Sequence, residues 1–250
     1  MEKYSFEKAQ KEANIIKKNA LELKVEKNEN GEPNRDDYEK AEKEKINESV
    51  ERMECGIDEK MEILLVVHDA KPAGDMEYVI SSKEDENNFK KTIKTLGYLG
   101  LNVISSESDA HADDALQNEK IINISFSKND ELLVDDIKTL NEEEYDIKNG
   151  KAFGFPETAV VAYVNMYGKG ELPYEERDFV WRRELPDNIK ETDVYPYITF
   201  GVLSKKHWQE EIKTAQHWKE TIEKVNPKFH EKYLKWAREE WLHDEIKIKS

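Results

Sequence analysis

Residues 62–68 read Glu-Ile-Leu-Leu-Val-Val-His, and this short apolar run decides how the neighbouring segments are interpreted. A continuous apolar run of this length is typical of a strand that is buried on both faces of a sheet. We therefore predict a strand over 62–68, followed by a loop. Weaker strand patterns follow at 78–81, 101–105 and 121–126, and an amphipathic helix is predicted over 83–98. Together with the strand at 62–68, these elements predict a strand–helix–strand core.

The segments on either side of this core have mainly helical patterns. A helical hairpin is predicted over 1–60, and an α/β body over 61–150. Residues 151–250 are predicted to form helices with one strand at 195–203. Ser204 is predicted to cap the first of two long helices, and Asn226-Pro227 to begin the last one. Within the body, Asn129 or Asp130 is predicted to cap a helix that runs to 140. The expected fold is α+β or α/β, with a small mixed sheet of about four or five strands and a helix-rich C-terminal part. We expect the three regions to pack as one globular unit.

The first helix of the predicted hairpin carries small and apolar residues at alternating spacings of three and four, as in a coiled coil. This seam over 6–23 could dock on the second helix, which begins at Asp36 and closes near Cys55-Gly56. The alternative, which we place second to docking within the chain, is contact with a protein partner or with a second copy of the chain. The seam residues are Phe6, Ala9, Ala13, Ile16, Ala20 and Leu23.

Composition excludes several classes of protein. The chain has 250 residues and a formal net charge of -16, and charged residues make up 38% of it. We expect no membrane span, because no window holds the roughly 18 apolar residues that a span requires. The acidic balance argues against nucleic-acid binding, which needs a basic surface. A single cysteine and no apolar leader pattern at the start indicate a cytoplasmic protein without disulfides.

The strongest polar cluster is Asp-Ala-His-Ala-Asp at 109–113. Carboxylate and imidazole groups are ordinary ligands of divalent metals, so Asp109, His111 and Asp113 are candidate metal ligands. The alternative is a helix N-terminus on which acidic residues favour the helix dipole.

His68 and Asp69 are the candidate catalytic residues and possible partners of that cluster. If the predicted strands 62–68 and 101–105 are parallel, both polar segments lie at the same carboxyl edge, where open α/β sheets bind ligands. If 62–68 instead pairs antiparallel with the next strand, the segments lie at opposite ends and the site does not form. The sequence leaves both arrangements open.

Other chemistry-bearing residues are interpreted structurally. The repeated pairs His207-Trp208 and His217-Trp218 are ten residues apart, which turns a helix by about 280° and points the histidines apart. We expect the tryptophans to pack in the core. Cys55 has no histidine near it in the sequence and is interpreted as a structural thiol. Nucleotide-binding and nucleophile-elbow motifs do not occur in the sequence.

The segment Gly154-Phe-Pro-Glu-Thr-Ala-Val160 resembles a G-Y-P-x-C-C-V segment of uncharacterised archaeal proteins. Thr158 and Ala159 stand where those proteins have paired cysteines, so no thiol or metal role is carried over. The resemblance implies a shared entry from a turn into a helix and no function.

Two functions remain open at this stage. The first is a binding or regulatory module that acts through protein–protein contacts. The second is a metal-assisted hydrolase or an acid–base enzyme for a small substrate, with its site near His68 and His111.

Overall fold

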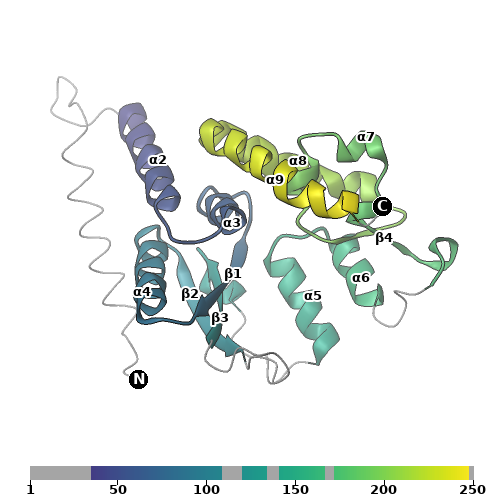
Figure 1. The fold of residues 1–250 in the computed structure, drawn as a ribbon, viewed down its shortest axis with the longest axis horizontal. Coiled ribbons are helices and arrows are strands. Elements are labelled where there is room, and N and C mark those ends of the chain that lie inside the picture. Colours follow the sequence, from purple (N-terminus) through teal and green to yellow (C-terminus); the bar gives the residue numbers. More distant parts are fainter. Residues whose placement is uncertain (1–34, 109–119, 134–140, 167–171, 248–250) are drawn as a thin grey trace. The chain divides into compact units, whose positions relative to one another are not determined.

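The computed structural model describes residues 35–108, 120–133, 141–166 and 172–247. Its internal contacts divide the chain into two compact units. The first unit comprises 1–67 and 74–133, and the second comprises 68–73 and 134–250. Each unit is described by itself below, with the element labels of Figure 1.

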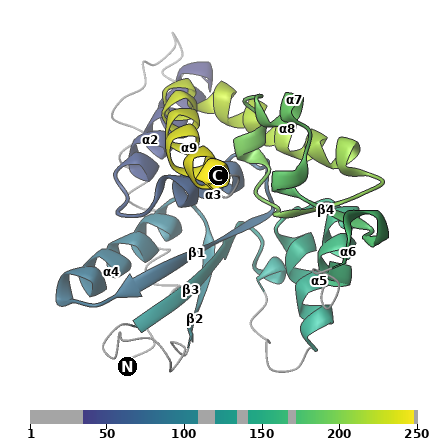
Figure 2. The ribbon, with the colours of Figure 1, turned by 45° about the vertical axis from the view of Figure 1, so that its right-hand side comes forward.

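The first unit combines three described helices with a three-stranded sheet. β3 lies between β1 and β2, and Figure 2 shows α4 beside these strands. β2 and β3 pair antiparallel, from Asn102 opposite Ser127 to Ser108 opposite Ile121. The elements are α2 (Arg35–Glu51), α3 (Ile57–Val67), β1 (Ala73–Ile80), α4 (Lys83–Tyr98), β2 (Asn102–Ser108), β3 (Lys120–Ser127) and the 3-10 turn η1 (Asp130–Leu132).

The prediction of a strand at 62–68 is wrong, because this run lies in helix α3. Asp58 and Glu59 occupy the first turn of α3, where acidic side chains favour the helix dipole. All residues from Ile63 to Val67 are buried, so the C-terminal half of the helix is apolar on every side, as in a helix segment that is surrounded by the core. A short apolar run does not distinguish such a helix from a buried strand.

Other predictions for the first unit are confirmed. The helix over 83–98 has the predicted bounds, and the Ser82 side chain caps it by accepting from the Asp85 amide. Strands occur at all three of the weaker patterns. The second helix of the predicted hairpin is α2, although it ends at Glu51 and not at Cys55. The seam over 6–23 lies outside the described residues.

The second unit is mostly helical. Its two strands, β4 and β5, pair antiparallel, with Phe179 opposite Ser204. The elements are α5 (Glu142–Ala152), α6 (Glu157–Met166), η2 (Tyr174–Glu176), β4 (Phe179–Trp181), η3 (Arg182–Glu184), α7 (Asp187–Lys190), η4 (Tyr195–Tyr197), β5 (Val202–Ser204), α8 (Trp208–Val225) and α9 (Pro227–Lys247).

Two long helices hold the aromatic core of this unit. Trp218 of α8 is buried, and so is Tyr233 of α9, whose hydroxyl donates to the Pro196 carbonyl at 2.9 Å. The predicted start of α9 is confirmed, since the Asn226 side chain accepts from the Phe229 amide at 3.1 Å. The first residue of α8 is Trp208, so the prediction that Ser204 caps this helix is wrong.

The strand predicted over 195–203 is mostly wrong. Residues 195–197 form a 3-10 turn, and only 202–204 are a strand. The helix predicted to run from 129 or 130 to 140 is a short 3-10 turn at 130–132, and 134–140 lie outside the described residues. The Asn129 side chain does cap this turn by accepting from the Glu131 amide at 3.1 Å, but a cap determines where an element begins and not how long it is.

The expected α+β class with a helix-rich C-terminal part is confirmed. The five strands of the described residues form two separate sheets, of three and two strands. Across these same residues, every helix is too short or too polar to cross a membrane.

Packing in the first unit depends on a close approach at Gly74. A Cβ atom at this position would lie 2.7 Å from the buried Phe126 ring. We expect Gly74→Ala to lower the free energy of unfolding by about 1–3 kcal/mol, because the ring must shift within a packed core. Urea denaturation measures this change.

Gly97→Ala is the matched control in the same unit. A Cβ at Gly97 meets no atom within 4 Å, and the residue lies inside α4. We expect this variant to gain about 0.5–1 kcal/mol, since alanine restricts the unfolded chain. Equal urea midpoints for the two variants would contradict the close packing at Gly74.

Candidate functional site

The second unit contains a pocket of about 310 Å³. Three segments form its wall: α5 with its C-terminal turn, α6, and the residues that lead into β5. Most of the lining side chains are apolar or aromatic, and the polar ones are few, which is the usual composition of a small-molecule site. The lining residues are Asp146, Asn149, Gly150, Phe153, Phe155, Ala159, Val160, Tyr163, Thr199, Phe200, Gly201 and Val202.

The turn between α5 and α6 positions two aromatic rings of the wall. Gly154 has a φ of +71° and forms a bend just after α5. Two backbone amides at this bend donate hydrogen bonds to carbonyls near the end of α5. The Phe155 amide donates to the Gly150 carbonyl at 3.0 Å, and the Gly154 amide donates to that of Lys151 at 3.0 Å. This is a Schellman motif, for which glycine is favoured. It reverses the chain and brings Phe153 and Phe155 to the pocket.

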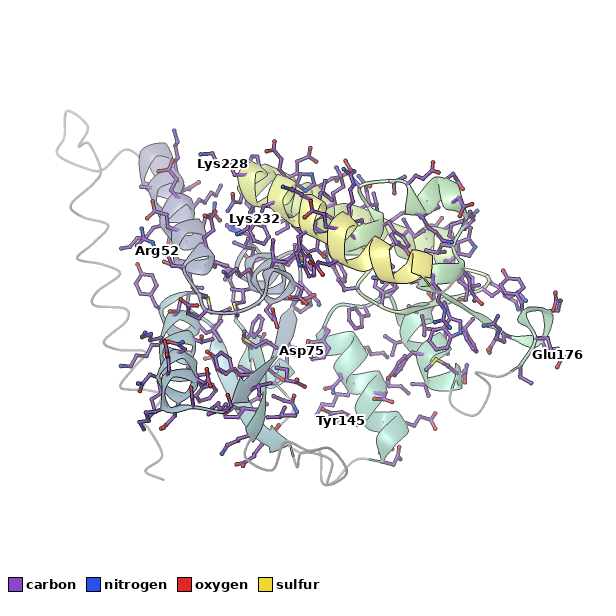
Figure 3. All side chains as sticks on the ribbon, in the orientation of Figure 1. Arg52, Asp75, Tyr145, Glu176, Lys228 and Lys232 are labelled. Atoms are coloured by element: carbon purple, nitrogen blue, oxygen red, sulfur yellow. The ribbon has the colours of Figure 1, made fainter. Side chains whose placement is uncertain are left out.

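Close helix packing forms another part of the wall. A Cβ atom at Gly150 would lie 2.6 Å from a Val160 methyl group, so only glycine allows α5 and α6 to approach as they do. Figure 3 shows the side chains of both helices and labels Tyr145, the neighbour of Asp146 on α5. The pocket therefore depends on a small residue at the helix–helix contact.

A buried carboxylate ties the walls together. Glu211 of α8 is 2% exposed. Its carboxylate accepts a hydrogen bond from the Thr158 hydroxyl at 2.5 Å and another from the Ser204 amide at 2.9 Å. Thr158 precedes a lining residue of α6, and Ser204 ends β5, so one side chain fixes both elements. Burial raises the pKa of Glu211, although these two hydrogen bonds act in the opposite direction.

Two oxygen atoms of lining residues have no hydrogen-bond partner among the described residues. They are Asp146 Oδ2 and Thr199 Oγ1, and both are withdrawn from solvent. The Asp146 side chain as a whole is only half-buried. None of the described lining residues is positively charged. Unpartnered buried oxygens are uncommon in proteins, and they often mark a place where a ligand or water binds.

The aromatic wall also contacts a buried lysine. Lys71 is 2% exposed, and its ammonium lies 4.9 Å from the ring centre of Phe155 and 5.1 Å from that of Trp218. The Trp218 indole donates to the Ala70 carbonyl at 3.1 Å. Cation–π attraction and this hydrogen bond attach the segment 68–73 to the second unit. Phe155 therefore contacts both the buried cation and the pocket.

The structure does not place the predicted catalytic residues at the end of a strand. Since 57–67 is helix α3, the prediction that a strand delivers His68 and Asp69 to a sheet edge is wrong. Asp109, His111 and Asp113 lie outside the described residues, so their role as metal ligands stays a prediction. Within the part of the chain that is described, no three His, Cys, Asp or Glu side chains are grouped as a metal site requires.

The structural interpretation of the other candidates agrees with their surroundings. Trp218 lies in the core as predicted, whereas Trp208 is only half-buried; His207 and His217 are exposed. Burial raises the pKa of the Cys55 thiol to about 12, so this thiol stays protonated at neutral pH. A protonated thiol is a weak nucleophile.

The pocket residues Asp146 and Thr199 were not identified from the sequence. Helix α5 has too weak an apolar pattern to be recognised, and Thr199 lies within the strand predicted over 195–203, in a part of it that is not a strand. The available signal was the glycine at 154, which suits the end of a helix at 152 as well as the start of the next.

The raised pKa of Glu211 predicts a pH dependence of stability. The folded state holds this proton more tightly than the unfolded chain, so the free energy of unfolding falls as pH rises from the ordinary value of 4.5 through the folded pKa. Glutamine can accept from Ser204 and donate to Thr158. We therefore expect Glu211→Gln to gain stability relative to the wild type between pH 4 and 7, as measured by urea denaturation.

Glu223→Gln on the same helix is the control with the opposite sign. Lys219 lowers the pKa of Glu223, so its contribution is present above 4.5 and is lost as pH falls through the folded pKa. This variant should lose stability relative to the wild type at neutral pH and not in acid. Parallel pH profiles for the two variants would contradict the assignment.

No protein-family model, curated protein or solved structure matches the chain. The short resemblance over 154–160 therefore remains a resemblance, and its local meaning is the helix entry at α6. What the protein binds has to be inferred from the geometry of the pocket.

Proposed function

We propose that the protein is a binding module and that the pocket of the second unit holds a small, largely apolar ligand. The observation that carries this proposal is the pocket itself, about 310 Å³ in volume, with phenylalanine and aliphatic walls and a few polar side chains. Ligand sites in proteins have this size and composition.

The walls supply the affinity. A bound ring that loses about 100 Å² of apolar surface gains on the order of 2.5 kcal/mol. Phe153, Phe155 and Phe200 are flat surfaces for such a ring, and ring contacts with Trp218 hold two of them, Phe155 and Phe200, in place. Little reorganisation is then needed on binding, which lowers the cost of association.

The carboxylate brace supports a preformed site. Glu211 fixes α6 and β5 whether or not a ligand is present, because both its partners belong to the protein. A site held in this way can bind and release a ligand without refolding its walls.

Of the two functions predicted from the sequence, this proposal adopts one. A binding module is retained, with a small molecule as the occupant. Contacts with a protein partner through the seam over 6–23 stay a prediction, because the seam lies outside the described residues. The metal-assisted hydrolase or acid–base enzyme with its site near His68 and His111 also stays a prediction, because His111 lies outside the described residues.

Saturation-transfer NMR with the full chain and a mixture of neutral, anionic and cationic aromatic fragments tests the proposal. We expect a subset of fragments to bind the wild type. Ala159→Leu should abolish their signals, because Ala159 is buried in the pocket wall and the larger side chain fills the space. Asn149→Leu fills the pocket from α5 at a half-buried position, where the fold is easier to keep.

Val161→Leu is the matched control. Val161 is an exposed residue of α6 that does not line the pocket, so this variant should retain every signal. Circular dichroism verifies that the variants are folded. Fragments that bind equally well to the filled variants would refute the pocket as the binding site, and so would the absence of any bound fragment.

A further inference from the structure

We propose that the ligand is a small amine that binds as its ammonium, with the charge at Asp146 and an apolar or aromatic body against the phenylalanine wall. This inference rests on the proposed function, because it names the ligand class of the same pocket. The inference follows from the negative charge of the pocket lining, from the unpartnered oxygens of Asp146 and Thr199, and from the position of the buried Lys71 ammonium.

The described part of the pocket wall carries one negative charge that no described residue neutralises. Asp146 is the one carboxylate among the described lining residues, and it forms no ion pair with any residue of the described ranges. The described lining residues include no lysine, arginine or histidine. A ligand with a positive charge is therefore the complement of this surface, whereas a carboxylate ligand would meet a like charge.

Partial burial strengthens this preference. Oδ2 of Asp146 is out of contact with solvent and has no donor, so part of the hydration of the carboxylate is lost without replacement. The residue as a whole is half-buried and lines the pocket. An ammonium in the pocket would compensate the charge through a charge-assisted hydrogen bond.

Thr199 adds a second acceptor to the pocket lining. Its hydroxyl oxygen is buried and has no partner in the described residues, and Asn149, whose side chain carries an amide oxygen, is also a lining residue. An ammonium carries three donors and no acceptor, so three oxygen groups are the set it can use. A neutral alcohol has one donor and would satisfy fewer of them.

Lys71 determines which end of the pocket the charge occupies. Its ammonium already lies over Phe153 and Phe155, at 5.8 Å and 4.9 Å from the ring centres. A second cation on these rings would be repelled. The apolar body of the ligand should therefore contact the phenylalanine wall, and its ammonium should lie toward Asp146. The net charge of -16 further favours the approach of a cation.

Isothermal titration of the full chain with three matched probes tests the charge preference. The probes are 2-phenylethylamine, 2-phenylethanol and 3-phenylpropanoate. We expect the amine to bind with a dissociation constant on the order of 0.1–1 mM, and the alcohol at least about tenfold more weakly. The carboxylate should not bind. Equal or tighter binding of the alcohol or the carboxylate would overturn the assignment of an amine.

Asp146→Asn tests the residue. It preserves shape and removes the charge, and we expect the affinity for 2-phenylethylamine to fall at least about tenfold while that for 2-phenylethanol changes less than threefold. Glu143→Gln is the control, since it removes one charge from an exposed position of the same helix. Thr199→Val should weaken the amine severalfold. Unchanged amine affinity in Asp146→Asn would overturn the proposal.

Nα-acetyl-lysine N-methylamide distinguishes a free amine from a lysine of a protein partner. We expect it to bind more weakly than 2-phenylethylamine, because its peptide groups do not fit an apolar wall. Tighter binding of the lysine probe would assign the pocket to a protein side chain. If fragments of other charge bind and are lost in Ala159→Leu, the proposed function stands and only the ligand class fails; if nothing binds, both fail.

Discussion

The second unit depends on one buried carboxylate. Glu211 lies on α8, and its two oxygens accept from the start of α6 and from the end of β5. Burying a carboxylate costs free energy unless its oxygens accept hydrogen bonds. Glu211 is therefore tolerated in the core only when its donors on α6 and β5 are both in place. The interaction therefore favours the native packing over alternatives, because a misplaced α6 or β5 would leave the carboxylate without a donor in the core. The same side chain that stabilises the unit therefore also defines the shape of its pocket.

Local chemistry made several elements predictable from the sequence. The start of α4 follows from a serine cap, and that of α9 from asparagine followed by proline, because caps are decided by neighbouring residues. Helix α3 was not predictable in the same way. Whether residues 62–67 form a helix or a strand depends on what covers them, and a fully buried run carries no periodicity that distinguishes the two.

The candidate site was even less accessible to sequence reasoning. Asp146 is one acid in the run Glu-Glu-Glu-Tyr-Asp, and only the fold separates it from the exposed acids beside it. Residues 195–203 are mostly apolar and aromatic, a composition that predicts one continuous strand. In the structure a 3-10 turn occupies 195–197 and β5 begins only at Val202, so Thr199 lies between the two elements, where it lines the pocket. In contrast, His68 and Asp69 were predicted as catalytic residues mainly from their chemistry. A polar pair next to an apolar run is a weak indicator when the geometry of the run is unknown.

The six residues 68–73 have a consequence for how the protein can be divided. The chain leaves the first unit after Val67, joins the second as far as Ala73, and then returns to the first. Neither unit is therefore a contiguous stretch of sequence. A fragment that begins at 134 would lack Lys71, which covers the aromatic wall, and also the carbonyl that the Trp218 indole uses. Truncation at a single boundary therefore cannot isolate either unit intact.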